Sequence, residues 1–164
     1  MHEKQLRQLS ITVGNKLKER GAWVTCAESC TGGWVAKALT DIAGSSAYFD
    51  RGFVTYSNAA KHDLLGVQES TLESYGAVSE AVVQEMAHGA LRKANADFAI
   101  SISGIAGPDG GSAEKPVGTV WFAFATGEGQ IVARKQLFHG DRDAVRLQAT
   151  VFALQTLLDD FLEK

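Results

Sequence analysis

Hydrophobic residues recur along the N-terminal third at helical and then at extended spacing. Residues 6–17 place leucine and valine on one helical face, which predicts an amphipathic helix ending at Gly21. Residues 23–27 indicate a short strand. Residues 31–33 (Thr-Gly-Gly) then open a second helix, whose apolar face runs through residues 35–42. The first pattern is therefore helix, strand, helix.

The middle of the chain repeats this alternation. Residues 51–56 predict a second strand, and residues 58–65 a short helix with Asn58 as its cap and Gly66 at its end. Ser79 is typical of an N-cap, and a longer helix follows it. The inward face of this longer helix is predicted to carry Val82, Val83, Met86, Ala90, Leu91 and Ala94.

The last third contains a hairpin and a final helix. Residues 98–103 predict a strand, and residues 104–116 a loop rich in glycine, proline, aspartate and serine. Residues 117–125 and 131–138 read as two strands joined by a tight glycine-containing turn. Asp141 caps a helix whose apolar face carries Leu147, Val151, Leu154, Leu158 and Phe161.

Strands that alternate with helices favour parallel pairing, whereas the hairpin requires an antiparallel pair. The pattern predicts an α/β fold: a mixed, mostly parallel sheet of about five strands with helices on both faces. There is no internal repeat, linker or low-complexity stretch, so we expect residues 1–164 to form a single domain.

Composition narrows the class of function. The chain has 164 residues, 45% of them hydrophobic, and none of its apolar runs approaches the roughly 20 residues that span a bilayer. A net charge of −3 argues against nucleic-acid binding and favours a small-molecule substrate. The only cysteines, Cys26 and Cys30, fit a reducing, cytoplasmic compartment and are too few for a metal site. The polar N-terminus does not resemble a signal peptide.

Ser29 lies where a strand gives way to a glycine-opened helix. Its hydroxyl would sit at the edge of the sheet, beside the free amides of the first helical turn. The amides from Cys30 through Thr31 and Gly32 to Gly33 are candidates to stabilise an oxyanion formed when Ser29 attacks a carbonyl. The alternative is that Ser29 and Thr31 only cap the helix. Cys30 is a rival nucleophile, although buried cysteines are usually packing residues.

A serine nucleophile needs a base, and Lys61 is a candidate. It follows a predicted strand on a short helix, and desolvation can lower the pKa of a lysine towards neutrality. Tyr56 is a candidate to relay a proton or to orient the amine. His62 is the one histidine in a suggestive place. The alternative is that Lys61 is an ordinary solvated lysine.

Glycines in residues 104–111, Gly104 and Gly107 among them, permit close approach of the backbone to a ligand. Their spacing does not match a dinucleotide-binding or Walker motif. A flexible connection is the alternative. Arg142 and Arg146 lie one turn apart at a helix start, where they suit a phosphate or carboxylate, or else pair with neighbouring acids.

Residues 112–115 match the Ser-x-x-Lys pattern of penicillin-recognising enzymes. That chemistry requires a helix, which brings the serine and the lysine together one turn apart. Here the pattern lies in a glycine-rich loop and runs into Pro116. The match is therefore predicted to be accidental.

Five motifs occur in order along nearly the whole chain: AESCTGG at 27–33, GFVTYSN at 52–58 followed by Lys61, GAVS at 76–79, SGIAGP at 103–108 and KPVGTV at 115–120. Together they resemble the C-terminal domain of the CinA family, the nicotinamide-nucleotide amidases of bacteria. The chain is similar to the stand-alone form, because nothing in it corresponds to the N-terminal domain of longer members.

The resemblance implies a three-layer α/β/α sandwich. It also implies hydrolysis of nicotinamide mononucleotide to nicotinic acid mononucleotide and ammonia, in pyridine-nucleotide salvage, with no metal or other cofactor. Carried over by motif, Ser29 is the nucleophile, Lys61 the base and Tyr56 an accessory group. A homo-oligomer is expected by the same analogy, and Arg142, Arg146 or the 104–111 loop would hold the phosphate.

Two other functions stay open at this point. One is a module that binds a pyridine nucleotide without cleaving it, since a shared fold need not carry a shared activity. The other is an amidase for a different carboxamide or lactam, for which a phosphate would be irrelevant.

Overall fold

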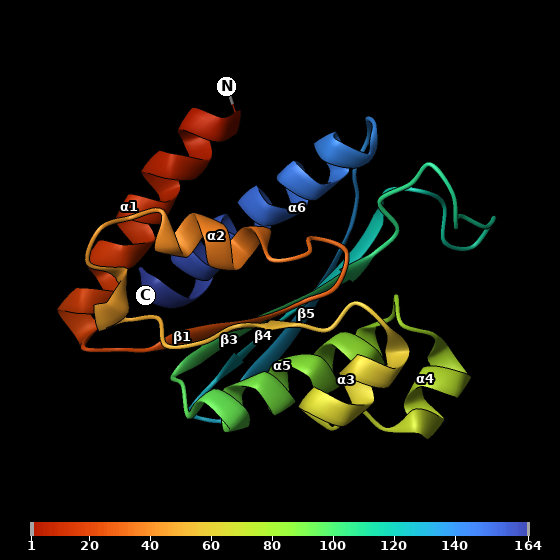
Figure 1. Cartoon of the computed structure of the whole chain (residues 1–164), viewed down its shortest axis with the longest axis horizontal. Coiled ribbons are helices and arrows are strands. Elements are labelled where there is room, and N and C mark those ends of the chain that lie inside the picture. Colours follow the sequence, from red (N-terminus) through yellow and green to blue (C-terminus); the bar gives the residue numbers. More distant parts are fainter. Residues whose placement is uncertain (1, 164) are drawn as a thin grey trace.

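The computed structural model describes residues 2–163, and its centre is a five-stranded sheet in the order β2-β1-β3-β4-β5 (Figure 1). The strands are β1 (Val24–Glu28), β2 (Phe53–Val54), β3 (Phe98–Gly104), β4 (Thr119–Thr126) and β5 (Ile131–Leu137). Helices cover both faces, as predicted. The arrangement is a three-layer α/β/α sandwich.

One helical layer contains α1, α2 and α6, and the other contains α3, α4 and α5 (Figure 1). The helices are α1 (His2–Arg20), α2 (Trp34–Thr40), α3 (Asn58–Leu65), α4 (Glu69–Tyr75), α5 (Glu80–Ala94) and α6 (Arg142–Thr156), with a 3-10 turn at Ser45–Ala47 and a π-helical turn at Leu157–Leu162. No helix within residues 2–163 is both long and apolar enough to cross a membrane.

Side chains point alternately to the two faces of the sheet along each strand, and they form two different hydrophobic cores. Large side chains such as Ile100 and Phe122 join the core beneath α1 and α6. Ala99 and Ala123, on the other side of the same strands, join the core beneath α5. Small residues let α5 approach the sheet, and at Gly89 a Cβ atom would overlap the backbone of α3.

The sheet is mixed, but it is not mostly parallel as predicted. β1 pairs in parallel with β2 and β3, whereas β4 pairs antiparallel with both β3 and β5. The connection from β3 to β4 contains no helix, so the chain returns beside β3 in the opposite direction. The predicted hairpin is confirmed as β4 and β5.

Some predicted boundaries were wrong. Ser57, not Asn58, caps α3: its hydroxyl accepts a hydrogen bond from the amide of Ala60 at 3.0 Å. The strand predicted at 51–56 is reduced to two paired residues. α4 was missed because it buries no residue and so shows no apolar face in the sequence. The caps predicted at Ser79 and Asp141 are confirmed.

Candidate active site

The candidate site lies at the carboxyl ends of the parallel strands. Ser29 follows β1 directly, and its amide donates to the carbonyl of Ile102 in β3 at 3.0 Å. Lys61 comes from α3, which follows β2. These elements enclose a cavity of about 280 Å³, lined among others by Ser29, Tyr56, Lys61, Gly104, Gly107 and Arg142.

Lys61 and Ser29 form a direct pair. The Nζ of Lys61 lies 2.9 Å from the Oγ of Ser29, 3.0 Å from the carbonyl oxygen of Thr55 and 3.2 Å from that of Tyr56. A neutral amine has two N–H donors and one lone pair. In the structure Nζ donates to all three oxygens, and the Ser29 hydroxyl donates to the carbonyl of Tyr56 at 3.4 Å. In the neutral amine, two donors serve the two carbonyls and the lone pair is left for the proton of the serine hydroxyl. The surroundings of the nitrogen therefore suit a general base.

Burial favours the neutral form of Lys61. The residue is only 1% exposed, and desolvation lowers the pKa of its ammonium group from the ordinary value of 10.5. Within residues 2–163 no carboxylate lies close enough to form an ion pair with it. The thiol of Cys30 opposes this shift more weakly than burial drives it, and burial raises the pKa of that thiol to about 11, which keeps it protonated near neutral pH. The same raised pKa makes Cys30 a poor rival nucleophile.

Local structure places Lys61 on the inner side of α3. Ser57 caps the helix and its carbonyl accepts from the amide of Lys61 at 3.1 Å. Gly66, in the left-handed conformation, ends the helix five residues beyond the lysine. His62 is turned away, with its Nδ1 2.8 Å from the carbonyl oxygen of Val67. The lysine rather than the histidine thus faces Ser29.

Glu28 is an important residue that sequence reasoning missed. Its side chain is fully buried and accepts five hydrogen bonds: from the hydroxyl of Thr31 at 2.6 Å, from the thiol of Cys26 at 3.5 Å, and from the amides of Gly33, Val35 and Ala36 at 3.2, 3.0 and 2.9 Å. The carboxylate therefore satisfies the free amides at the start of α2. The signal was an acid at the end of a buried strand, followed by a threonine and two glycines.

The turn after Ser29 leaves fewer free amides than predicted. Gly32 and Gly33 both have positive φ, and α2 begins only at Trp34. The amide of Gly32 donates to the carbonyl of Ser29 at 3.1 Å, and that of Gly33 donates to Glu28. The amides of Cys30 and of Thr31 donate to no oxygen within residues 2–163. Two of the four predicted oxyanion donors are therefore occupied.

The two arginines have different surroundings. Arg142 lines the Ser29 cavity and donates to the hydroxyl of Tyr56 at 2.9 Å and to the carbonyl of Gly107 at 2.8 Å. Arg146 does not line that cavity. Its Nε donates to the carbonyl of Cys30 at 3.0 Å and its Nη2 to that of Thr31 at 3.3 Å. Only Arg142 is thus brought to Ser29 and Lys61.

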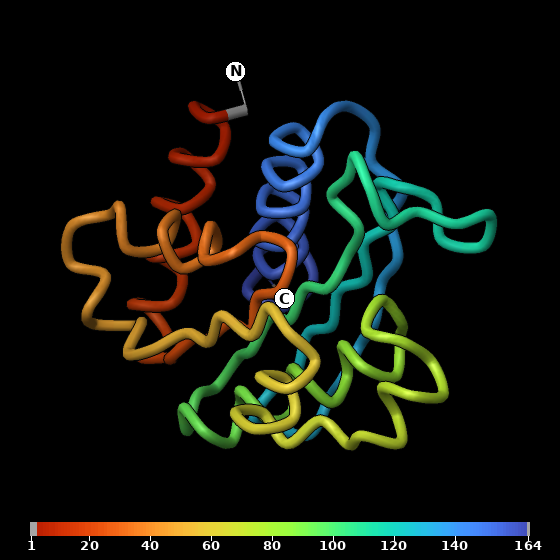
Figure 2. Tube along the Cα trace, turned by 45° about the vertical axis from the view of Figure 1, so that its right-hand side comes forward, coloured from red at the N-terminus to blue at the C-terminus, as the bar shows by residue number. Residues whose placement is uncertain are grey.

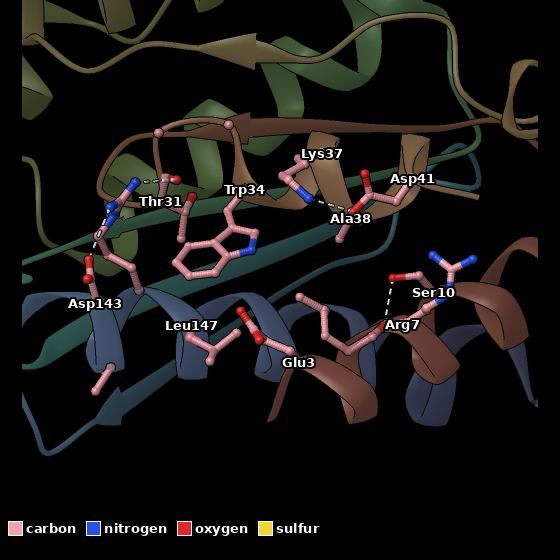
Figure 3. Close-up of a pocket in the computed structure, with 15 residues that line it drawn as sticks. Glu3, Arg7, Ser10, Thr31, Trp34, Lys37, Ala38, Asp41, Asp143 and Leu147 are labelled. Carbon is pink, nitrogen blue, oxygen red and sulfur yellow. Dashed lines mark hydrogen bonds and ion pairs between the residues drawn. The ribbon is translucent and has the colours of Figure 1, made fainter. Parts of the chain in front are cut away.

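Arg146 instead borders a larger groove of about 880 Å³ between α1, α2 and α6. Thr31, Gly32 and Gly33 form part of its wall, and the ring of Trp34 lies along it (Figure 3). Lys37 in this groove is already paired with Asp41 at 2.7 Å. The smaller cavity is the better candidate, because Ser29 and Lys61, the predicted nucleophile and base, both line it.

The loop between β3 and β4 extends away from the sheet (Figure 2). Its tip is a tight turn in which the amide of Lys115 donates to the hydroxyl of Ser112 at 3.0 Å, and the Nζ of Lys115 donates to the carbonyl of Tyr75 at 2.9 Å. No helix forms there. Ser112 and Lys115 are therefore turn residues, as predicted.

Comparison with known families defines the class of protein. The sequence profile described as the CinA C-terminal domain matches residues 6–161. The chain belongs to this family. The predicted resemblance is thereby confirmed, as are the α/β fold and the mixed sheet.

Individual relatives are similar over their full length. The chain is 71% identical, over 99% of both chains, to a protein of Enterobacter agglomerans named nicotinamide-nucleotide amidohydrolase PncC. It is 68% identical, with the same coverage, to the protein of that name from Escherichia coli K12. Among solved structures, the competence/damage inducible protein CihA of Agrobacterium tumefaciens superposes with a TM-score of 0.93 at 46% identity, covering 97% of this chain and 96% of that one.

Proposed function

We propose that this protein hydrolyses the carboxamide of nicotinamide mononucleotide, giving nicotinic acid mononucleotide and ammonia. The observation that carries the proposal is the 2.9 Å contact between the Nζ of Lys61 and the Oγ of Ser29 at the edge of a cavity. The two relatives named PncC, nearly the same length as this chain, support the choice of substrate.

The first half of the reaction forms an ester. Neutral Lys61 takes the proton of the Ser29 hydroxyl while Oγ attacks the carboxamide carbon. The carbonyl oxygen becomes an oxyanion, stabilised by the free amides of Cys30 and Thr31. The Lys61 ammonium then returns its proton to the nitrogen of the leaving group. The C–N bond breaks, ammonia leaves, and a nicotinoyl ester remains on Ser29.

The second half releases the acid. Lys61, neutral again, takes a proton from a water molecule, whose oxygen attacks the ester carbon. The second tetrahedral intermediate collapses and Ser29 regains its proton from Lys61. Nicotinic acid mononucleotide leaves, and the enzyme returns to its starting state. The two steps consume one water and need no metal or redox group.

Tyr56 and Arg142 prepare the site in this proposal. The carbonyl of Tyr56, rather than its hydroxyl, holds the amine of Lys61. The hydroxyl accepts a hydrogen bond from Arg142 and so orients the guanidinium group beside the cavity. Arg142 then binds the phosphate, together with the backbone near Gly104 and Gly107. The phosphate is remote from the reacting carbon, and its binding energy holds the substrate in position for the reaction.

The deciding experiment incubates the purified protein with nicotinamide mononucleotide in the presence of a chelator and measures both products. Equal amounts of ammonia and nicotinic acid mononucleotide are expected. A folded wild-type protein that binds the nucleotide without cleaving it would favour the binding module. Cleavage of another carboxamide but not of this nucleotide would favour a different amidase.

Three further expectations belong to this proposal. Residues 1–164 act as one amidase domain, the protein works in the cytoplasm in pyridine-nucleotide salvage, and it forms a homo-oligomer. Size-exclusion chromatography with light scattering tests the last of these, and a monomeric mass at micromolar concentration would contradict it.

A further inference from the structure

We propose that Arg146 is a positioning residue for the oxyanion site, acting through the peptide groups of the Ser29 turn rather than on the phosphate. The inference rests on the proposed acyl transfer at Ser29. It reassigns a side chain that the sequence placed among the substrate contacts. Arg146 holds two backbone carbonyls of the turn, and hydrogen bonds connect them to the cavity.

Arg146 is fixed by several partners at once. Its Nε and Nη2 donate to the carbonyls of Cys30 and Thr31 at 3.0 and 3.3 Å. Its guanidinium carbon lies 5.6 Å from the centre of the Trp34 ring, and its Nη1 lies 3.8 Å from a carboxylate oxygen of Asp143. The planar fork of an arginine suits two neighbouring carbonyls, which a lysine cannot span in the same way.

Peptide geometry carries this contact to the cavity. In a trans peptide the carbonyl and the N–H of the next residue point in opposite directions. The carbonyl of Thr31 faces Arg146, so the N–H of Gly32 points away from it and donates to the carbonyl of Ser29 at 3.1 Å. The N–H of Cys30 shares a peptide group with that carbonyl and points away from it in turn.

This chain of peptide groups ends at the amide of Cys30, whose one contact among the described residues is with its own thiol. Within residues 2–163 the N–H of Cys30 donates to no oxygen, and Cys30 lines the Ser29 cavity. Hydrogen bonds in series polarise one another, and a guanidinium at one end strengthens the donor at the other. The second carbonyl held by Arg146 belongs to Cys30 itself, which fixes the peptide carrying the N–H of Thr31.

Arg146 therefore orients and polarises the N–H of Cys30, which lines the cavity and would receive the oxyanion, and it fixes the next peptide, that of Thr31, beside the neighbouring groove. The negative charge of the oxyanion exists only in the transition state and in the tetrahedral intermediates. Arg146 therefore contributes to kcat and not to binding of the substrate in the ground state. A phosphate contact would instead act mainly through KM. The two roles make opposite predictions for the same substitution.

The test compares Arg146→Ala with wild type in steady-state hydrolysis of nicotinamide mononucleotide. We expect kcat to fall by at least about tenfold and by no more than the 10²–10³-fold loss typical of deleting an oxyanion donor. KM should change little. Because the adjoining groove is open, added guanidinium ions should restore part of the lost kcat. The inflection of the pH–rate profile, set by Lys61, should stay in place.

Asp143→Asn is the matched control. It removes the ion pair of Arg146 but leaves both hydrogen bonds to the carbonyls, and kcat should remain near that of wild type. The amide proton of Cys30, followed by NMR, should move upfield in Arg146→Ala and stay in place in Asp143→Asn. If Arg146→Ala does not fold, Arg146→Lys carries the same comparison, with a smaller loss of kcat.

An Arg146→Ala variant with unchanged kcat would overturn the inference. So would a raised KM with unchanged kcat, which would restore the role in phosphate binding. A folded wild-type protein that releases no ammonia would overturn the proposed function and this inference together. An active wild type with an equally active Arg146→Ala would overturn this inference alone.

Discussion

The Nζ of Lys61 lies 2.9 Å from the Oγ of Ser29, although the two residues are 32 positions apart. Ser29 comes from the turn after β1 and Lys61 from the helix after β2, and these strands are parallel neighbours. Parallel pairing brings both carboxyl ends to one edge of the sheet, where α/β proteins bind their ligands.

Ser29→Ala should abolish release of ammonia while leaving binding of the nucleotide nearly unchanged, because the hydroxyl is the proposed nucleophile and a nucleophile contributes little to ground-state affinity. Steady-state kinetics and calorimetric titration measure the two effects. Ser112→Ala removes a hydroxyl of the exposed loop turn and serves as control. Turnover that survives in Ser29→Ala would exclude Ser29 as the nucleophile.

Activity should rise with pH as Lys61 loses its proton. Only the neutral amine accepts a proton from Ser29, and burial lowers the pKa of Lys61 from 10.5. The profile of kcat/KM should therefore climb through that lowered pKa and level off above it. Lys61→Met should be inactive at every pH, whereas Lys115→Met on the exposed loop should keep the wild-type profile. A rate that falls as the pH rises through this range would contradict a lysine base.

The same lysine should make stability depend on pH. Between its lowered pKa in the folded state and the ordinary value of 10.5, the unfolded chain binds more protons than the folded chain. The free energy of unfolding should therefore increase with pH across this window. Urea unfolding at several pH values should show this slope in wild type, reduced in Lys61→Met. Parallel curves for the two proteins would mean that the pKa is not lowered.

Arg142→Ala should raise KM for nicotinamide mononucleotide by about tenfold to a hundredfold, the worth of a charge-assisted hydrogen bond. Nicotinamide riboside lacks the phosphate and should show no such change. Tyr56→Phe should cause a smaller rise in KM, because its hydroxyl touches the guanidinium and not Lys61. Arg134→Ala, at an exposed ion pair on β5, is the control. If Tyr56→Phe lowers kcat instead, the hydroxyl relays a proton.

Glu28→Ala should be among the most destabilising substitutions, by about 3–5 kcal/mol, because it leaves buried donors without an acceptor. Glu28→Gln should cost less, since one amide oxygen still accepts while the NH₂ group faces donors. Urea unfolding measures both. Glu85→Gln, at a more exposed cap of α4, provides a comparison. A change below 1 kcal/mol for Glu28→Ala would show that water replaces the carboxylate.

Most local features could be predicted from the sequence. The helices, the caps at Ser79 and Asp141 and the β4–β5 hairpin follow from spacing and turn residues within a few positions. The exceptions are also local: α4 lacks an apolar face, and Ser57 competes with Asn58 for the same cap. The antiparallel direction of β4 beside β3 was not predicted; it arises because the connection between these two strands contains no helix.

The amino-acid sequence by itself determined the elements, the family and the side chains able to carry the chemistry. The tertiary structure decided which of them meet. It buried Lys61 against Ser29, placed Arg142 in the cavity and Arg146 behind the turn, and enclosed Glu28 under α2. Adjacent positions on one helix face different surroundings, and burial depends on which strands become neighbours. The spacing of residues along the chain specifies neither the surroundings of a side chain nor its burial, because both arise from packing between distant segments.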